Sequence, residues 1–406
     1  LKKNQAVTKE VVFKNIPYGG FTISTIPDLV ERSFVRIHEN NAVWGSGYQV
    51  GLISGMLEST QEFVSPESVQ LYWSNVYGKP GDFGRMVRMA GATWNQSWRC
   101  YNGYIGVLQP EQGKFDWSRT DLQLKNARNN KIKPSFAMFT QSLLVKRSGQ
   151  DMGMLVPPWL RQTDRYGHPE GKTYGNWQQF KIVVPPPQVI ADHVKALLQR
   201  YPNQYANIQL FGEFNGYMTP AMISEYAAAI LPLVKKYSPE SQFIAYTPTG
   251  DFQGNVGLCY QQLMKIGAGK YTQAYSFHPY DSPMDDSPNP AQKSIRAIKK
   301  SFRDAGMNMP LWNTEVYYLH KTWDYNYEAA AITRRFAIDM GEGVRASSPL
   351  TDKPLFDNHK TPLCDFNNTL MEPNAKFAAY NAAGHFFNGA VPVATLENNS
   401  VLGYTF

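Results

Sequence analysis

Cysteine is scarce in this sequence, and long apolar runs are missing. The three cysteines among 406 residues, Cys100, Cys259 and Cys364, lie far apart and form no Cys-x-x-Cys pair. This spacing argues against a zinc knuckle or a dithiol redox centre, and the odd number leaves at least one thiol unpaired within the chain. No apolar stretch approaches the roughly 20 residues that a membrane-spanning helix needs. We therefore expect no membrane span.

Runs of basic residues are also absent. Lysine and arginine number 40 against 33 aspartates and glutamates, a net charge of +7, and the charges are dispersed. Nucleic-acid binding needs a concentrated basic face that follows the phosphates, so we expect no nucleic-acid partner. A mildly cationic surface favours an anionic polysaccharide as a partner, although ordinary drift in charge explains the excess equally well.

Aromatic residues are abundant. They make up 14% of the chain, with 9 tryptophans and 24 tyrosines. Flat apolar faces of this kind stack on sugar rings in open clefts, and they also fill cores. Composition leaves both explanations open.

Strand-like and helical segments alternate from about residue 82 onward, which is typical of βα units around a parallel sheet. Strand patterns occur at 92–100, 134–139, 207–213, 242–247, 272–280, 310–317 and, more weakly, 344–348. Helical patterns occur at 119–130, 189–201, 220–237, 290–305, 325–341 and 373–387. The sequence therefore predicts an α/β fold, a (β/α)8 TIM barrel with extra β-strand segments at both termini.

Three segments of the chain are predicted. Residues 1–65 have strand and turn patterns and form an N-terminal β-rich segment, with the barrel as a surface on which it could pack. The catalytic barrel occupies 66–390, and 391–406 is a C-terminal strand or the start of a β-domain. The first barrel strand comes from 48–53 or from 69–73, and the pattern does not choose between them.

A long segment at 140–188 is rich in proline, glycine and aromatic residues and has no sustained period. In a barrel, a segment that follows a strand lies at the C-terminal face, where active sites are built. We expect a long aromatic loop that forms one wall of a cleft, with Trp159 and Trp177 contacting the ligand. A structural lid without ligand contact is the alternative.

Two glutamates end predicted strands. The strand at 207–213 is largely apolar until Glu213, and the strand at 310–317 reaches Glu315 in the same way. Burying a lone carboxylate is costly, so both side chains are expected at the mouth of the barrel. Glycoside hydrolysis needs two carboxyl groups that flank one bond, about 5 Å apart when configuration is retained. Their positions suit that chemistry.

Several passages resemble the clan A glycoside hydrolases, (β/α)8 enzymes whose catalytic glutamates end the fourth and seventh strands. The match spans about residues 80–390 and, within the clan, is closest to family 39, the β-xylosidase and α-iduronidase type. The passages are Gly-Ala-Thr-Trp-Asn-Gln-Ser-Trp-Arg at 91–99 with 109–117 and Asp121, Gly-Glu-Phe-Asn-Gly at 212–216, Phe-His-Pro-Tyr at 277–280 and Trp-Asn-Thr-Glu at 312–315.

The resemblance implies a retaining glycoside hydrolase that cleaves a β-linked poly- or oligosaccharide without metal or cofactor. Glu213 would be the acid/base and Glu315 the nucleophile, with Tyr280 hydrogen-bonded to Glu315. The other side chains expected to bind substrate are Arg99, Trp94, Trp98, Asn215, His278 and Trp312, beside Trp159 and Trp177. A secreted, periplasmic or cell-surface location is also implied, with a signal peptide that is not part of this sequence.

Two departures from the clan pattern concern sugar binding. Gly212 stands where the clan usually has an asparagine that bonds the sugar 2-hydroxyl, and the eighth strand lacks the usual tryptophan. A non-catalytic carbohydrate-binding protein on a decayed barrel is therefore the main alternative, although both glutamates are kept. A metal-dependent hydrolase would need histidines at several strand ends, and of the 7 histidines only His278 has such a place.

Overall fold

The computed structural model describes most of the predicted barrel and parts of both terminal segments. It describes residues 21–25, 35–39, 71–72, 94–96, 104–129, 131, 133–151, 156–250, 256–281, 283–284, 289–316, 325–349, 364–367, 370–373, 375–387, 391–398 and 401–406.

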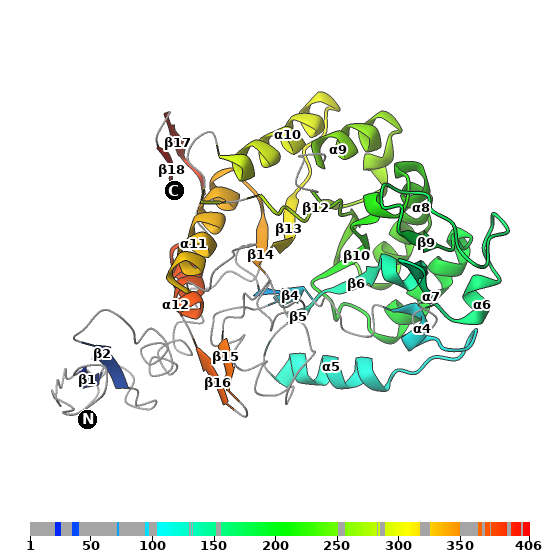
Figure 1. The fold of residues 1–406 in the computed structure, drawn as a ribbon, viewed down its shortest axis with the longest axis horizontal. Helices are drawn as coiled ribbons and strands as arrows, with labels where there is room; N and C mark the ends of the chain where they lie inside the picture. The colour runs from blue at the N-terminus through cyan, green and yellow to red at the C-terminus, as the bar shows by residue number, and fades with distance from the viewer. Residues whose placement is uncertain are drawn as a thin grey trace.

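Parallel strands form the centre of the molecule (Figure 1). A six-stranded sheet has the order β14-β13-β12-β11-β10-β6, and a three-stranded sheet has the order β3-β4-β5. Only Ser135 separates β5 from β6, and β14 contacts β3, so the two sheets form one ring. The strands are β3 (Leu71–Tyr72), β4 (Trp94–Gln96), β5 (Lys133–Pro134), β6 (Phe136–Phe139), β10 (Asn207–Gly212), β11 (Gln242–Tyr246), β12 (Ala274–Phe277), β13 (Leu311–Val316) and β14 (Ala346–Pro349).

This ring confirms the predicted (β/α)8 barrel. The first strand, β3, lies within 69–73, and it pairs in parallel with β4. The competing candidate, 48–53, lies outside the described residues. By this count β10 is the fourth strand and β13 the seventh, as predicted for the strands that carry Glu213 and Glu315.

Helices cover the outside of the strands (Figure 1). Two of them begin as capping preferences predict: the Thr219 side chain accepts from the Met222 amide, and Asn289 accepts from the Ala291 amide. The helices that alternate with the barrel strands are α5 (Ser118–Asn129), α7 (Pro187–Arg200), α8 (Pro220–Tyr237), α9 (Val256–Lys265), α10 (Pro290–Asp304), α11 (Tyr325–Gly341) and α12 (Ala375–Phe387). Among the described residues, no helix combines the length and apolarity needed to cross a membrane.

Helix α9 was not expected from the sequence. It has 10 residues and includes Gly257, which weakens the helical pattern. The glycine has a packing reason, because a Cβ at this position would lie 3.2 Å from the Cβ of Ala297 on α10. Close approach of α9 and α10 therefore explains a residue that disfavours the helix locally.

The segment at 140–188 is more ordered than the predicted loop. It contains a 3₁₀ turn (Thr140–Leu143), the short helix α6 (Pro158–Arg161) and the antiparallel sheet β8-β7-β9, made of β7 (Leu144–Arg147), β8 (Gln150–Asp151) and β9 (Phe180–Ile182). Several of its apolar residues, among them Val145 and Val183, are fully buried in the main core. The sequence did not indicate these strands, because two- to four-residue strands are too short to show a period.

Antiparallel hairpins lie at both ends of the described chain, as predicted, and one more lies before α12, within the range predicted for the barrel. They are β1 (Phe21–Thr25) with β2 (Val35–Glu39), β15 (Cys364–Asn367) with β16 (Leu370–Pro373), and β17 (Ala394–Glu397) with β18 (Leu402–Thr405). Tyr404 of β18 bonds the Glu342 carboxylate at 3.0 Å and packs where a Cβ at Gly341 would be, so the last hairpin is fixed on the end of α11. The segment boundaries at 65 and 390 remain predictions.

A buried ion pair supports the strand that carries Glu315. Arg335 and Asp339, both on α11, have side chains 1% and 0% exposed and approach to 2.9 Å. Asp339 also accepts hydrogen bonds from the Asn313 amide at 2.8 Å and the Ser347 hydroxyl at 2.6 Å. The carboxylate thus links α11 to β13 and β14.

Removing this carboxylate should destabilise the fold. In the Asp339→Ala variant, Arg335 stays buried without its carboxylate, and Asn313 and Ser347 lose their acceptor, so the free energy of unfolding should fall by about 3–5 kcal/mol. Urea denaturation of the purified variant measures it. Asp304→Ala removes the exposed pair with Lys300 and should cost under about 1 kcal/mol. Equal losses in the two variants would refute the structural role given to Asp339.

Candidate active site

Glu213 follows the last residue of β10 and turns sharply into the barrel mouth. Its φ of 60° is left-handed, a conformation that costs a non-glycine residue about 1–3 kcal/mol. The strand before it is buried along its whole length, and the Glu213 amide donates to the Thr247 carbonyl at 2.7 Å. A 3₁₀ turn (Phe214–Gly216) begins directly after it. The strained backbone turns the half-buried Glu213 carboxylate away from the direction of β10.

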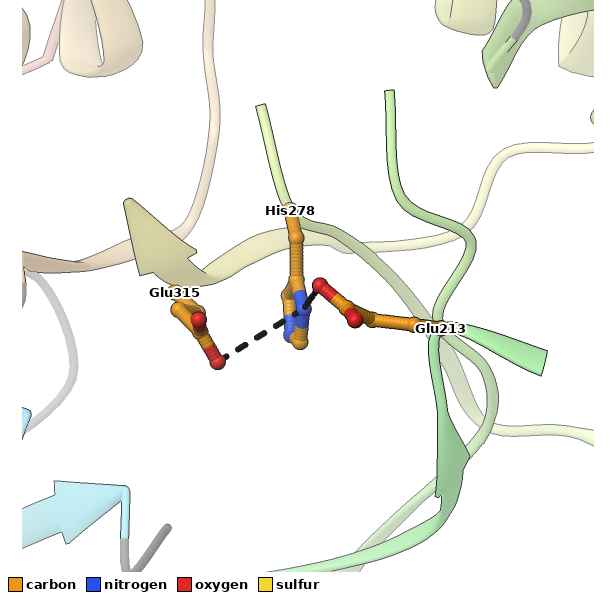
Figure 2. A group of neighbouring side chains, drawn as sticks. All are labelled: Glu213, His278 and Glu315. Atoms are coloured by element: carbon orange, nitrogen blue, oxygen red, sulfur yellow. Dashed lines mark hydrogen bonds and ion pairs between the residues drawn. The ribbon is translucent and has the colours of Figure 1, made fainter. Parts of the chain in front are cut away.

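Glu315 lies near the end of β13 and is only 4% exposed. Figure 2 shows its carboxylate and that of Glu213 directed toward each other from different strands, with the His278 ring between them. A carboxylate oxygen of each glutamate and a ring nitrogen of His278 lie within 4.8 Å of one another. The predicted convergence of two strand-end carboxylates is therefore present in the structure.

Tyr280 connects the two carboxylates through one hydroxyl. Its oxygen lies 2.8 Å from Oε1 of Glu315 and 3.2 Å from Oε1 of Glu213. A phenol has a single proton, so it can donate to only one carboxylate at a time. The shorter contact is with Glu315, which is left as the acceptor.

His278 lies completely buried beneath this pair. Its Nδ1 is 3.2 Å from Glu213 Oε1 and 3.7 Å from Glu315 Oε2, and its Nε2 is 3.2 Å from the Thr314 hydroxyl. Burial favours the neutral ring, but the charge of Glu315 and the hydrogen bond to Glu213 outweigh it, so the pKa of His278 lies above its ordinary value. The imidazolium supplies positive charge between the two carboxylates.

The raised pKa of His278 predicts how the free energy of unfolding depends on pH. Protonation favours the folded state, so this stabilisation is complete below the ordinary pKa of 6.5 while the carboxylates are ionised. It is lost as the pH rises through the raised value. The unfolding free energy of the native protein minus that of His278→Gln should therefore be larger at about pH 6 than at about pH 9. A difference that grows with pH would contradict the charged ring.

Asn215 and Trp312, two of the residues expected to bind substrate, have partners within the protein. The Asn215 amide donates to the Thr249 carbonyl at 3.0 Å, and its oxygen accepts from the Thr249 amide at 2.9 Å. This pairing joins the ends of β10 and β11. Trp312 is 4% exposed and packs with Ile244, Ala274 and Ala346. Contact of either side chain with substrate stays a prediction.

Three other predicted binding residues cannot be placed by their side chains. Trp98 and Arg99 lie outside the described residues. Trp94 begins β4, the second barrel strand, so its backbone is at the expected position, but its side chain lies outside the described part of the chain. Their contact with substrate stays a prediction.

Trp177 and Trp159 have different surroundings in the 140–188 segment. The Trp177 amide donates to the Gly216 carbonyl at 3.0 Å, and its ring packs edge-on against Tyr217 with centroids 5.0 Å apart. It therefore covers the turn that follows Glu213. Trp159 donates its indole N–H to the Gln109 carbonyl at 3.1 Å and packs on the core. Trp177, not Trp159, is the tryptophan of this segment that borders the catalytic turn.

Sequence reasoning missed two aromatic residues of this border. The Phe180 and Tyr217 rings stack with centroids 5.2 Å apart and an interplanar angle of 18°. Tyr217 lies four residues after Glu213, and Phe180 three residues after Trp177. The signal available in the sequence was the closeness of these aromatic residues to Glu213 and Trp177.

Gly216 sets how closely Trp177 can cover the turn. A Cβ at this position would overlap the indole ring, so Gly216→Ala should lower the unfolding free energy by about 1–3 kcal/mol. It should also lower kcat/KM by about tenfold through displacement of the Glu213 turn. Thermal melts and kinetics measure the two effects. The matched variant Gly403→Ala, where the nearest atom would be 3.7 Å away, should change neither.

The donor set Glu213, His278 and Glu315 is close enough to hold a metal ion, and no other such group occurs among the described residues. The Tyr280 hydroxyl donates to Glu315, and Nε2 of His278 is hydrogen-bonded to the Thr314 hydroxyl. Catalysis without a metal remains the prediction.

The barrel has glutamates at the ends of its fourth and seventh strands, the positions that the resemblance to clan A glycoside hydrolases implies. No protein-family model and no curated protein matches the sequence. Solved structures do match. A family 39 glycoside hydrolase from the gut symbiont Bacteroides cellulosilyticus WH2 aligns with a TM-score of 0.56 at 14% identity, over 95% of this chain and 74% of that one.

Two further structures extend the comparison. Xylanase 10B from Thermotoga maritima aligns with a TM-score of 0.54 at 13% identity, over 81% of this chain and 97% of that one. The exo-β-1,4-mannosidase Op5Man5 from Opitutaceae bacterium strain TAV5 aligns at 0.53 and 11% identity, over 78% and 59%. The resemblance inferred from the sequence, including its family 39 aspect, is confirmed for the fold. At these identities the likeness carries the fold alone.

Proposed function

We propose that this protein is a retaining glycoside hydrolase with Glu213 as acid/base and Glu315 as nucleophile. One observation carries the proposal: carboxylate oxygens of the two glutamates lie within 4.8 Å of each other and share the Tyr280 hydroxyl. Inverting enzymes need about 6.5–9.5 Å between the carboxyl groups to admit a water, whereas retaining ones have about 5–5.5 Å. The short separation favours double displacement.

The first half of the reaction follows from the hydrogen bonds. Glu213 gives its proton to the glycosidic oxygen while a Glu315 oxygen attacks the anomeric carbon. The bond between that carbon and the glycosidic oxygen breaks, the leaving sugar departs as an alcohol, and an ester joins the remaining sugar to Glu315. Tyr280 and His278 hold Glu315 as the ionised acceptor before attack.

The second half returns the enzyme to its starting state. Water enters the vacated position, Glu213 takes one of its protons, and the water oxygen attacks the anomeric carbon. The ester to Glu315 breaks and the carboxylate is released. Two inversions give net retention of configuration.

The substrate proposed is a β-linked poly- or oligosaccharide outside the cytoplasm. Support comes from the fold shared with a xylanase and a β-mannosidase and from the aromatic cover that Trp177 gives the catalytic turn. The net charge of +7 favours an anionic polysaccharide. Gly212 has no side chain at the position where the clan usually has a sugar-binding asparagine. A purely carbohydrate-binding protein is therefore the second candidate.

A glycan screen separates the two candidates. The purified protein is incubated with plant, algal and host polysaccharides, and new reducing ends are measured, with Glu213→Gln and Glu315→Gln in parallel. Hydrolysis by the native protein that is lost in both variants is expected. Hydrolysis that survives in both variants would refute the assignment, and binding without hydrolysis would establish the second candidate.

A further inference from the structure

Arg147 is an exposed cation at the end of β7, beside the catalytic turn. Its guanidinium carbon lies 5.5 Å from the centre of the Phe180 ring on β9. Phe180 stacks in turn on Tyr217, which follows the Glu213 turn. Stacking on an aromatic face leaves the N–H groups at the edge of a guanidinium free to bind an anion.

The strand register separates Arg147 from other cations of the same sheet. Arg147 is paired with Phe180, whereas Lys146 is paired with Lys181. Residues opposite each other share a face and successive residues alternate, so the two lysines lie on the other face of the sheet. Arg147 and Phe180 therefore form the face that meets Tyr217.

The acidic residues of this segment have cations or amides of their own. Asp151 contacts Arg161 at 2.7 Å, and Glu170 lies 3.7 Å from His168. Asp164 accepts from the Val184 amide at 2.6 Å and the His168 amide at 2.7 Å. None of these carboxylates neutralises Arg147, which forms no ion pair with another described residue. A charged group is thus presented without a counterion from this part of the protein.

Electrostatics links Arg147 to the acid/base. Burial raises the pKa of the Tyr217 hydroxyl, the Glu213 carboxylate raises it further, and the Arg147 guanidinium opposes both. The two charges thus act on the same hydroxyl with opposite effects on its pKa. Since Glu213 protonates the leaving group, a ligand group near Arg147 would belong to the leaving part of the substrate.

We propose that Arg147 forms a subsite for an anionic group of the saccharide, the carboxylate of a uronic acid or a sulfate ester, on the leaving-group side of Glu213. The subsite deepens, and rests on, the proposed glycosidase function. Arginine suits both anions because its fork of N–H donors matches two oxygens at once. Trp177, Phe180 and Tyr217 supply the apolar surface beside it.

Binding to an inactive background tests the subsite without turnover. Glu315→Gln is titrated calorimetrically with β-linked mannuronate oligosaccharides, carrageenan oligosaccharides and neutral xylo- and manno-oligosaccharides. We expect one anionic class to bind more tightly than the neutral ones. Adding Arg147→Gln should then raise its Kd by about 10- to 100-fold, since a charge-assisted pair is lost. Tighter binding of mannuronate oligosaccharides would identify a carboxylate as the anionic group, and tighter binding of carrageenan oligosaccharides a sulfate.

Lys181→Gln in the same background is the matched control. It removes one positive charge from the same sheet on the opposite face and should change the Kd less than about twofold. Equal weakening by Lys181→Gln, or no preference of the background for any anionic probe, would overturn the subsite. Cleavage of a neutral glycan without anionic preference would leave the proposed function standing. Binding that depends on Arg147, without cleavage by the native protein, would support the anion subsite and reject the proposed glycosidase function.

Discussion

Replacing Glu315 with glutamine should lower kcat by about 10⁵-fold with little change in the dissociation constant of the substrate. The amide keeps the size and the hydrogen bond to Tyr280, but it cannot attack the anomeric carbon. No glycosyl ester can then form, and the double displacement stops before its first bond is made. Initial rates on the substrate found in the glycan screen, with binding measured separately, give the two constants.

The matched control for Glu315 is Glu170→Gln. Glu170 has a side chain 62% exposed and lies beside His168, away from the two carboxylates. Its replacement should leave kcat within about twofold of the native value, as for surface changes generally. If Glu315→Gln kept more than about a hundredth of the native kcat, Glu315 would not be the nucleophile.

Replacing Glu213 with glutamine should give a loss that depends on the leaving group. A poor leaving group, such as an alcohol, needs the proton that Glu213 supplies, so kcat/KM should fall by about 10²–10⁴-fold. A dinitrophenolate needs no proton, so kcat/KM for a dinitrophenyl glycoside should change little. Steady-state kinetics on an alkyl and a dinitrophenyl glycoside of the same sugar measure the contrast.

Added azide distinguishes Glu213 from a residue that merely holds the fold. Azide attacks the glycosyl ester without needing a base, so it should restore kcat of Glu213→Gln on the dinitrophenyl glycoside and form a glycosyl azide. Equal losses of kcat/KM for the two leaving groups, without restoration by azide, would remove Glu213 from the acid/base role.

The barrel could be predicted because each buried strand leaves a local trace. The strand that ends at Gly212 is buried at every residue, and it appears in the sequence as a largely apolar run that stops at a glutamate. Segments whose order depends on contacts leave no such trace. Strand β7 has 4 residues and gains its order from pairing with β8 and β9. Helix α9 contains a glycine that only its packing on α10 explains.

The same division holds for the site. Glu213, His278, Tyr280 and Glu315 could be named in advance because each lies at or just beyond a strand end, and strand ends meet at one face of a barrel. The role of Asn215 could not, since its bonds to Thr249 depend on the approach of two strands. Trp312 was expected to bind substrate, and its packing with Ile244, Ala274 and Ala346 depends on the approach of three other strands.

The configuration of the first product tests the pairing of Glu213 and Glu315 most directly. Proton NMR spectra, taken at intervals during hydrolysis of the β-linked substrate identified in the screen, record which anomer appears before mutarotation. Carboxylate oxygens within 4.8 Å of each other predict that the β-anomer appears first and the α-anomer grows in later. Initial release of the α-anomer would show inversion and would contradict Glu315 as the nucleophile of a double displacement.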